Sequence, residues 1–219
     1  MMRWPNTTAR ARIAEALGRE NEMPKRRSLL IAGAALALAP AAAWANTEIN
    51  VPAPDFVGTD SNGKKWSLAE LKGKVVVIEL TNHDCPYVRK HYLPGNMQAQ
   101  QREAAAKGVV WLSLVASGPG RQGYVEGLEA NELTKSRNAA PAAVLLDPQG
   151  VIARAYGAQT TPHMYVIDAG GTLVYKGAID SVRSSNPEDV PRAKQYVRQA
   201  LEEVLAGKKV SEPSTRPYG

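Results

Sequence analysis

Cysteine is almost absent from this sequence, because Cys85 is the only one among 219 residues. One cysteine cannot form an internal disulfide, so a small fold held together by disulfides is excluded. The thiol is therefore either free and reactive or half of a bond to another molecule. Histidine is nearly as scarce, and two of the three histidines, His83 and His91, lie within six residues of Cys85.

The sequence also lacks a basic region outside its first 45 residues. Residues 1–45 hold seven Lys/Arg and three Asp/Glu and contribute +4, whereas the other 20 basic and 18 acidic residues contribute only +2. No basic patch with interleaved aromatic residues remains after this division. A nucleic-acid partner is therefore excluded.

No apolar run reaches the roughly 20 residues that a membrane-spanning helix needs. The run Leu29–Ala39 is shorter and is followed by Pro40. Lys25–Arg27 precede it, and Ala43-Trp44-Ala45 supplies a small-x-small cleavage site. This pattern predicts a cleavable export signal in residues 1–45. The mature protein is expected to begin near Asn46, in the periplasm, without membrane contact after cleavage near Ala45.

Two further features of residues 1–45 concern the export route and the start of translation. Arg26–Leu30 resembles the twin-arginine export motif, whose apolar region is also rich in Ala and Gly. Met23 is an alternative start, because residues 23–45 alone have the length of a normal signal. An uncleaved membrane anchor is the remaining alternative.

The surroundings of Cys85 favour a reactive thiol. Val75–Leu80 is a nearly continuous apolar run, which predicts a strand buried on both faces. Pro86 occupies a favoured first position of a helix, so Cys85 sits where a helix begins. Unpaired N–H groups and the positive end of the helix dipole favour a thiolate there. Arg89, four residues on, lies on the same helix face and can approach the sulfur. The alternative is a buried, inert cysteine.

Glu79 interrupts the apolar strand six residues before Cys85. A carboxylate at a buried position must be hydrogen-bonded or neutral. We therefore expect Glu79 to carry protons to and from the sulfur. The alternative is that Glu79 faces solvent or pairs with Lys74 or Arg89.

The other elements alternate strands with helices before a final hairpin and helix. The order predicts a single α/β domain over residues 46–219: a mixed central sheet flanked by helices, an N-terminal β-hairpin extension, and an irregular tail from about 208. The expected elements are a hairpin around Phe56 and Trp66, a helix from Pro86 broken at Pro94 and ending at Gly108, strands at 109–115 and 143–146, helices at about 122–137 and 151–156, a hairpin of strands 164–167 and 172–175, and a last helix from Pro191 to Gly207.

Thr161-Pro162-His163 precedes that last hairpin, at a position where a cis proline would shape a site. Together with the strand, cysteine and helix described above, this motif resembles the thioredoxin fold. Three segments resemble its peroxiredoxin-like branch, the alkyl hydroperoxide reductase and thiol-specific antioxidant (redoxin) family: residues 83–92, 156–163 and 173–180.

The resemblance implies a thioredoxin-fold, redox-active protein with Cys85 as its reactive thiol. Together with the export signal, it predicts an exported thiol-dependent oxidoreductase, for which we expect no cofactor. In this interpretation Cys85 reacts with a peroxide or a disulfide, and an external thiol, either a thioredoxin-like protein or a small thiol, resolves the product. Glu79 and Arg89 assist Cys85. Pro86, Thr161, Pro162 and His163 form the surface that binds substrate or partner.

The sequence departs from the family pattern at several positions. Thioredoxins have a second cysteine where this chain has Val88, so dithiol exchange within the motif is impossible. Peroxiredoxins have Thr or Ser at the position of Asn82, and Pro at the position of Ile78. Members of this branch often end in Gly-Cys and a short basic tail. That cysteine would come directly after Tyr218-Gly219, so the sequence shown holds no resolving thiol.

Two alternatives come from other functional classes. His83, Cys85, His91 and His163 are ligand types that bind copper or zinc when they gather around one point. A thioredoxin-like binding module without chemistry is the second alternative.

Overall fold

The structure is a computed structural model that describes residues 47–219. The expected export signal and its cleavage site lie outside these residues. No helix within residues 47–219 is long and apolar enough to cross a membrane.

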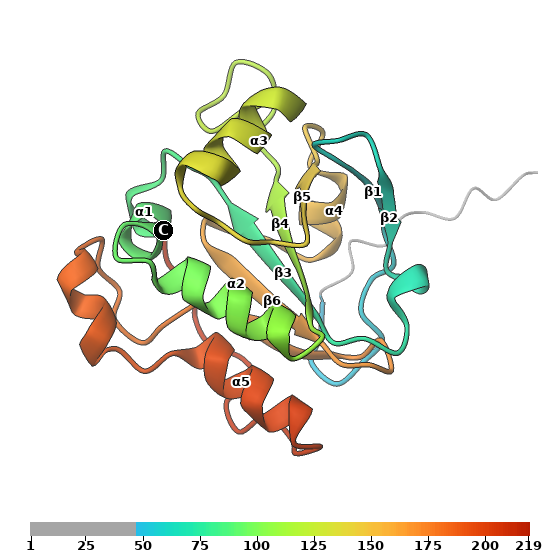
Figure 1. Cartoon of the computed structure of the whole chain (residues 1–219). Coiled ribbons are helices and arrows are strands. Elements are labelled where there is room, and N and C mark those ends of the chain that lie inside the picture. Colours follow the sequence, from blue (N-terminus) through green and yellow to red (C-terminus); the bar gives the residue numbers. More distant parts are fainter. Residues whose placement is uncertain (1–46) are drawn as a thin grey trace, which may run out of the picture. The chain divides into compact units, whose positions relative to one another are not determined.

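A seven-stranded mixed sheet forms the centre of the domain (Figure 1), with the strand order β2-β1-β5-β4-β3-β6-β7. The three strands β5, β4 and β3 are parallel to one another, and the remaining neighbours pair antiparallel. The strands are β1 (Val57–Asp60), β2 (Lys65–Ser67), β3 (Val76–Thr81), β4 (Val110–Val115), β5 (Ala143–Leu146), β6 (His163–Ile167) and β7 (Leu173–Gly177).

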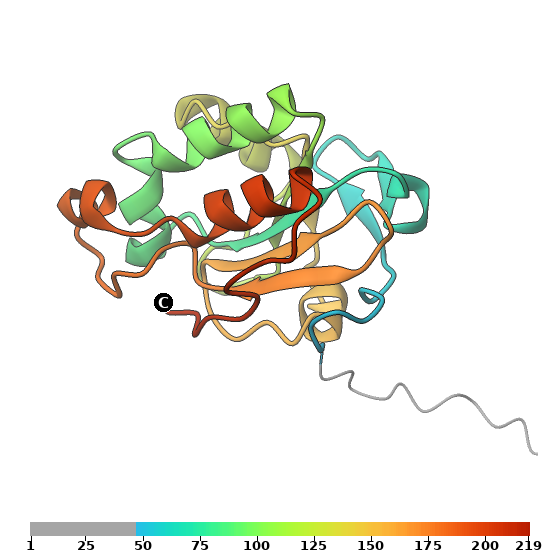
Figure 2. The same cartoon turned by 90° about the horizontal axis from the view of Figure 1, so that it is seen from below.

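Helices cover both faces of the sheet, as Figures 1 and 2 show. Together with the sheet they form the α/β, thioredoxin-like fold that the sequence predicts. The helices are α1 (Pro86–Tyr92), α2 (Asn96–Ala106), α3 (Gly127–Ser136), α4 (Val151–Ala155) and α5 (Tyr196–Leu205), with 3-10 turns η1 (Ala69–Leu71) and η2 (Pro187–Arg192).

All six residues of β3 are buried, and they alternate between two hydrophobic cores. The thiol-side core lies against α1, α2 and α5 and includes Val77, Cys85, Trp111, Met164 and Val166. The opposite core lies against α4 and the β1–β2 hairpin and includes Ile78, Leu112, Tyr165 and Ile167. A side chain's position in a strand therefore decides whether it can reach Cys85.

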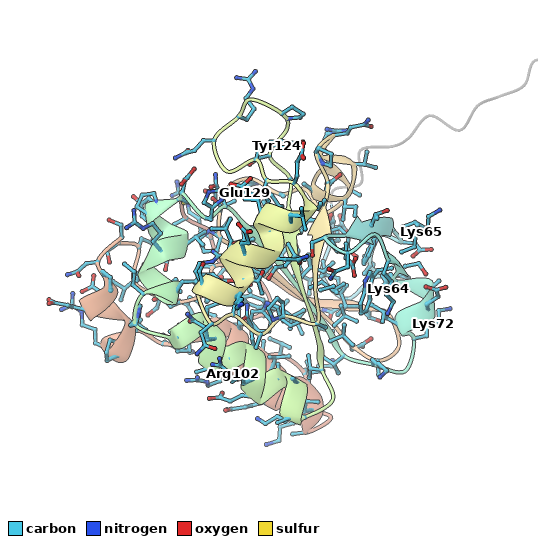
Figure 3. The ribbon with its side chains drawn as sticks, turned by 45° about the horizontal axis from the view of Figure 1, so that its top comes forward. Lys64, Lys65, Lys72, Arg102, Tyr124 and Glu129 are labelled. Atoms are coloured by element: carbon cyan, nitrogen blue, oxygen red, sulfur yellow. The ribbon has the colours of Figure 1, made fainter. Side chains whose placement is uncertain are left out.

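The β1–β2 hairpin confirms the predicted N-terminal extension. It joins the sheet by pairing β1 with β5, which leaves β2 at the edge. Figure 3 shows Lys64, Lys65 and Lys72 on this side of the domain, whereas Tyr124 lies in the loop before α3 and Glu129 lies in α3. Lysines beside an exposed edge strand discourage pairing with a second chain.

The last helix begins later than the sequence predicts. Pro191 lies in η2, and α5 begins only at Tyr196. The intervening backbone is extended because the Ser181 N–H donates to the Lys194 carbonyl at 3.0 Å. Helix α3 also begins late, at Gly127 and not near 122, since Gly123 adopts a positive φ of 79° in the preceding loop.

Candidate active site around Cys85

Cys85 lies just beyond the carboxyl end of β3, where α1 begins. A tight turn follows β3, in which the Cys85 N–H donates to the Asn82 carbonyl at 3.1 Å and the Asp84 N–H donates to Asn82 Oδ1 at 2.9 Å. Cys85 is the N-cap residue of α1 and Pro86 is its first residue, as predicted. The sulfur is thus delivered to the edge of the sheet, with 9% of the residue exposed.

The second half of the site is the loop before β6. The Thr161–Pro162 peptide bond is cis. Cys85 Sγ donates a hydrogen bond to the Thr161 carbonyl oxygen at 3.1 Å. Because β6 is the neighbour of β3, pairing of these strands brings together residues that are 76 positions apart. Cys85 and Pro86 therefore lie next to Thr161 and Pro162.

Glu79 lies fully buried on the β3 face that Cys85 also occupies. Its carboxylate accepts four hydrogen bonds, so it neither faces solvent nor pairs with Lys74 or Arg89. Tyr92 Oη donates to Oε1 at 2.9 Å, and Oε2 accepts from Gln101 Nε2 at 3.2 Å, Trp111 Nε1 at 2.8 Å and Ser113 Oγ at 3.1 Å. Burial, with a further contribution from the Glu79 charge, raises the pKa of Tyr92 well above its usual value, which keeps this hydroxyl protonated as a donor.

Arg89 is exposed to solvent. Its backbone N–H donates to the Cys85 carbonyl at 2.9 Å, as expected for the first turn of α1. Within the described part of the chain its guanidinium forms no hydrogen bond or ion pair with Cys85 or any other residue. Assistance of the thiolate by Arg89 stays a prediction.

His83 and His91 lie on either side of Cys85 in the chain but have separate surroundings. His83 Nε2 is 3.4 Å from Asp84 Oδ1, and its side chain lines a small cavity between the sheet and α3. His91 is fully buried, and its Nδ1 accepts from Asn96 Nδ2 at 3.0 Å. Burial lowers the pKa of His91 to about 4, although the nearby Asp180 carboxylate acts in the opposite direction.

His163 points away from Cys85, contrary to the prediction that it joins the substrate surface. As the first residue of β6 it shares a face with Tyr165, and the two rings lie 4.6 Å apart. Its Nδ1 accepts from the Gln159 N–H at 3.3 Å and lies 3.0 Å from Tyr165 Oη. Burial, with the charge of Lys176, lowers its pKa to about 4. The alternation of side chains along β6 places Met164, not His163, in the thiol-side core.

The alternative prediction, a metal site formed by His83, Cys85, His91 and His163, is contradicted by these positions. Within residues 47–219, no three His, Cys, Asp or Glu side chains are grouped closely enough to hold a metal ion. His83, Cys85, His91 and His163 are held apart by the contacts described above.

A buried charged cluster next to the site has no counterpart in the sequence predictions. Lys90 of α1 is fully buried, and its Nζ lies 2.8 Å from Asp180 Oδ2 and 2.6 Å from the Val182 carbonyl. Lys90 Nζ also donates to Tyr218 Oη at 3.1 Å. A lysine in a short polar helix gives no sequence signal of burial, since its partners lie about 90 and 128 residues away.

The comparisons with known proteins agree with this geometry. An uncharacterized conserved protein from Geobacillus kaustophilus superposes with a TM-score of 0.66 at 22% identity, covering 78% of this chain and 88% of the other. A hypothetical protein from Sinorhizobium meliloti gives 0.64 at 23% identity, covering 78% and 92%. No curated protein matches the chain. The AhpC/TSA family model matches residues 49–176, which include Cys85, Thr161 and Pro162. The chain therefore belongs to the AhpC/TSA family, with the thioredoxin-like fold and peroxiredoxin-like character of that family.

Proposed function

We propose that this protein is an exported thiol-dependent oxidoreductase: Cys85 reacts with a peroxide or a disulfide, and an external thiol restores it. The observation that carries the proposal is the hydrogen bond from Cys85 Sγ to the Thr161 carbonyl at 3.1 Å. The contact holds the single thiol between the start of α1 and the Thr161–Pro162 loop, which supports a reaction of the thiol at this point.

The proposal includes export. Residues 1–45 carry the features of a cleavable signal, so we place the mature protein in the periplasm, with cleavage near Ala45. Its domain then comprises residues 46–219. N-terminal sequencing of the protein recovered from the periplasm tests this part, and recovery of an uncleaved chain in the membrane fraction would contradict it.

With a peroxide, the Cys85 thiolate attacks one peroxide oxygen. An S–O bond forms, the O–O bond breaks, and the leaving oxygen takes a proton to become an alcohol or water. Cys85 is thereby oxidised to a sulfenic acid. An external thiol then displaces water to give a mixed disulfide, and a second external thiol releases Cys85 as the external disulfide forms.

With a disulfide, the Cys85 thiolate attacks one sulfur atom directly. The new S–S bond joins Cys85 to one half of the substrate, and the other half leaves as a thiolate. An external thiol again restores Cys85. Cys85 is the only cysteine among residues 1–219, so no other residue of this sequence can resolve the product, and we assign that step to an external thiol.

The neighbouring residues support this chemistry in different ways. We propose that Glu79 handles protons, that Arg89 and His83 stabilise the thiolate, and that Pro86, Thr161 and Pro162 shape the surface met by the substrate. The role of Glu79 in proton transfer is supported by its buried position on the side of the sheet that holds the thiol-side core. The role of Arg89 is supported by its position in α1, one turn after Cys85, which is the N-cap of the same helix.

The test is to trap the oxidised thiol. The purified protein is treated with hydrogen peroxide and a sulfenic-acid reagent, and in parallel with a small disulfide, and the mass of the Cys85 peptide is measured. A sulfenic adduct supports the peroxide reaction, and a mixed disulfide supports the disulfide reaction. Cys85→Ser is the control and is expected to give neither. If the wild-type protein also gives neither product, the non-catalytic binding module is the better interpretation.

A further inference from the structure

The last residues of the chain return to the Cys85 site. Residues 213–219, here called the C-terminal strap, run beside β7 and end next to α1 (Figures 1 and 2). The Lys176 N–H donates to the Pro213 carbonyl at 3.0 Å, and the Thr215 N–H donates to the Lys176 carbonyl at 3.1 Å. The strap therefore pairs with the free edge of β7 before it reaches the site.

The end of the strap lies against the loop that accepts the hydrogen bond of the thiol. A Cβ atom on Gly219 would overlap the Thr161 carbonyl oxygen, so the two backbones are in close contact. Cys85 Sγ donates to that same oxygen. The ring of Tyr218 packs edge-on against Tyr87, with the centroids 5.8 Å apart. In this arrangement only 9% of Cys85 is exposed.

The hydroxyl of Tyr218 holds the strap in place. It donates to Asp180 Oδ1 and accepts from Lys90 Nζ at 3.1 Å. Lys90 and Asp180 form a fully buried ion pair, which joins α1 to the segment after β7. Hydrogen bonds to charged groups are among the stronger single contacts in proteins. Loss of this hydroxyl should therefore favour release of the strap.

We propose that the C-terminal strap makes Cys85 selective for small substrates over polypeptide disulfides, and that Tyr218 is the residue that determines this selectivity. The inference rests on the proposed function of Cys85. A peroxide or a small thiol needs access only to the sulfur. A polypeptide disulfide brings a bulky chain to the sulfur, where Gly219 contacts Thr161 and Tyr218 packs against Tyr87, so in this proposal it reacts only after the strap is released.

The experiment compares two reagents that carry the same reactive group. Cys85 is alkylated with N-ethylmaleimide and, separately, with a maleimide on a long polyethylene glycol chain, and both rate constants are measured. The rate constant for the small reagent is divided by that for the large one. This ratio is then divided by the same ratio measured for free N-acetylcysteine. This quotient cancels the intrinsic reactivity of the thiol and reports size selection alone. The wild-type quotient is expected to be at least about 10. Tyr218→Phe should lower it by about tenfold, because the hydrogen bonds of the hydroxyl with Asp180 and Lys90 are lost.

Tyr196→Phe is the matched control, because within the described residues the Tyr196 hydroxyl has no hydrogen bond, and it should leave the quotient unchanged. A wild-type quotient near one would overturn the proposal. So would an excess that persists both in Tyr218→Phe and in a variant that lacks residues 213–219. Alkylation needs no redox activity, so absence of sulfenic acid and mixed disulfide would contradict the proposed function without affecting this test.

Discussion

At the scale of single residues, Glu79 shows how a charge is accommodated inside a central strand. Each carboxylate oxygen is hydrogen-bonded, and the donors come from α1, α2 and β4. A buried charge without such partners would cost several kcal/mol. The carboxylate therefore links the helix that carries Cys85 to the strands beneath it.

Replacement of this carboxylate by an amide is expected to destabilise the protein. In Glu79→Gln one acceptor oxygen becomes an NH2 group that faces the Tyr92 hydroxyl, so at least one charge-assisted hydrogen bond is lost. The free energy of unfolding should fall by about 2 kcal/mol, measured by urea denaturation. Glu129→Gln is the control, because Glu129 is exposed on α3 (Figure 3). Glu129 lies in the first turn of α3, so only its favourable interaction with the helix dipole is lost, and the free energy of unfolding should fall by less than about 1 kcal/mol. Equal stability of both variants would contradict this account.

At the scale of elements, the junction between α1 and α2 sets the length of the helix that begins at Cys85. The sequence predicts the break at Pro94, and α1 ends at Tyr92 while α2 begins at Asn96. Gly95 is the N-cap of α2 and has a φ of 78°, in the left-handed region. Glycine adopts this conformation without the steric cost that a Cβ atom brings.

Gly95→Ala is therefore expected to lower the free energy of unfolding by about 1 kcal/mol. A Cβ atom at this position would meet no heavy atom within 4 Å, so the cost comes from the backbone and not from a clash. Gly95→Asn is the matched variant, and thermal or urea unfolding should show a smaller loss, because asparagine tolerates the left-handed region better. A larger loss for asparagine than for alanine would refute this explanation.

At the scale of the whole molecule, two buried histidines couple folding to pH. The pKa values of His91 and His163 are both lowered to about 4, mainly by burial, from an ordinary value of 6.5. Between pH 6.5 and 4 the unfolded chain binds protons at these sites that the folded chain does not bind. Falling pH therefore favours unfolding over this range.

The free energy of unfolding is expected to be insensitive to these two groups above pH 6.5 and to fall between pH 6.5 and 4. Each histidine contributes on the order of 3 kcal/mol to the total loss. Denaturant titrations at a series of pH values provide the measurement. His163→Gln keeps an acceptor for the Gln159 N–H and removes one titrating group, so its stability should fall less steeply with acid. An unchanged slope in this variant would exclude His163 as a source of the effect.

Much of the fold follows from signals that act over a few neighbouring residues. The apolar run before Cys85, Pro86 at the start of α1 and the break at Pro94 each depend on local backbone preferences, and the structure agrees with all three. The predicted late hairpin is confirmed as β6 and β7. The start of α5 was not predictable in this way, because pairing of Lys194 with Ser181 overrides the helical signal of Pro191.

The sequence by itself determined the family, the strand and helix that flank Cys85, and the Thr161-Pro162 motif, because these depend on residue identity and short-range geometry. Only the tertiary structure decided which side chains reach the thiol. In the structure His163 lies on the face of the sheet opposite Cys85, beside Tyr165, and Arg89 is exposed to solvent. It also brought Lys90, Asp180 and Tyr218 into one buried cluster. Contacts between residues far apart in the chain depend on strand register and packing, which no local pattern specifies.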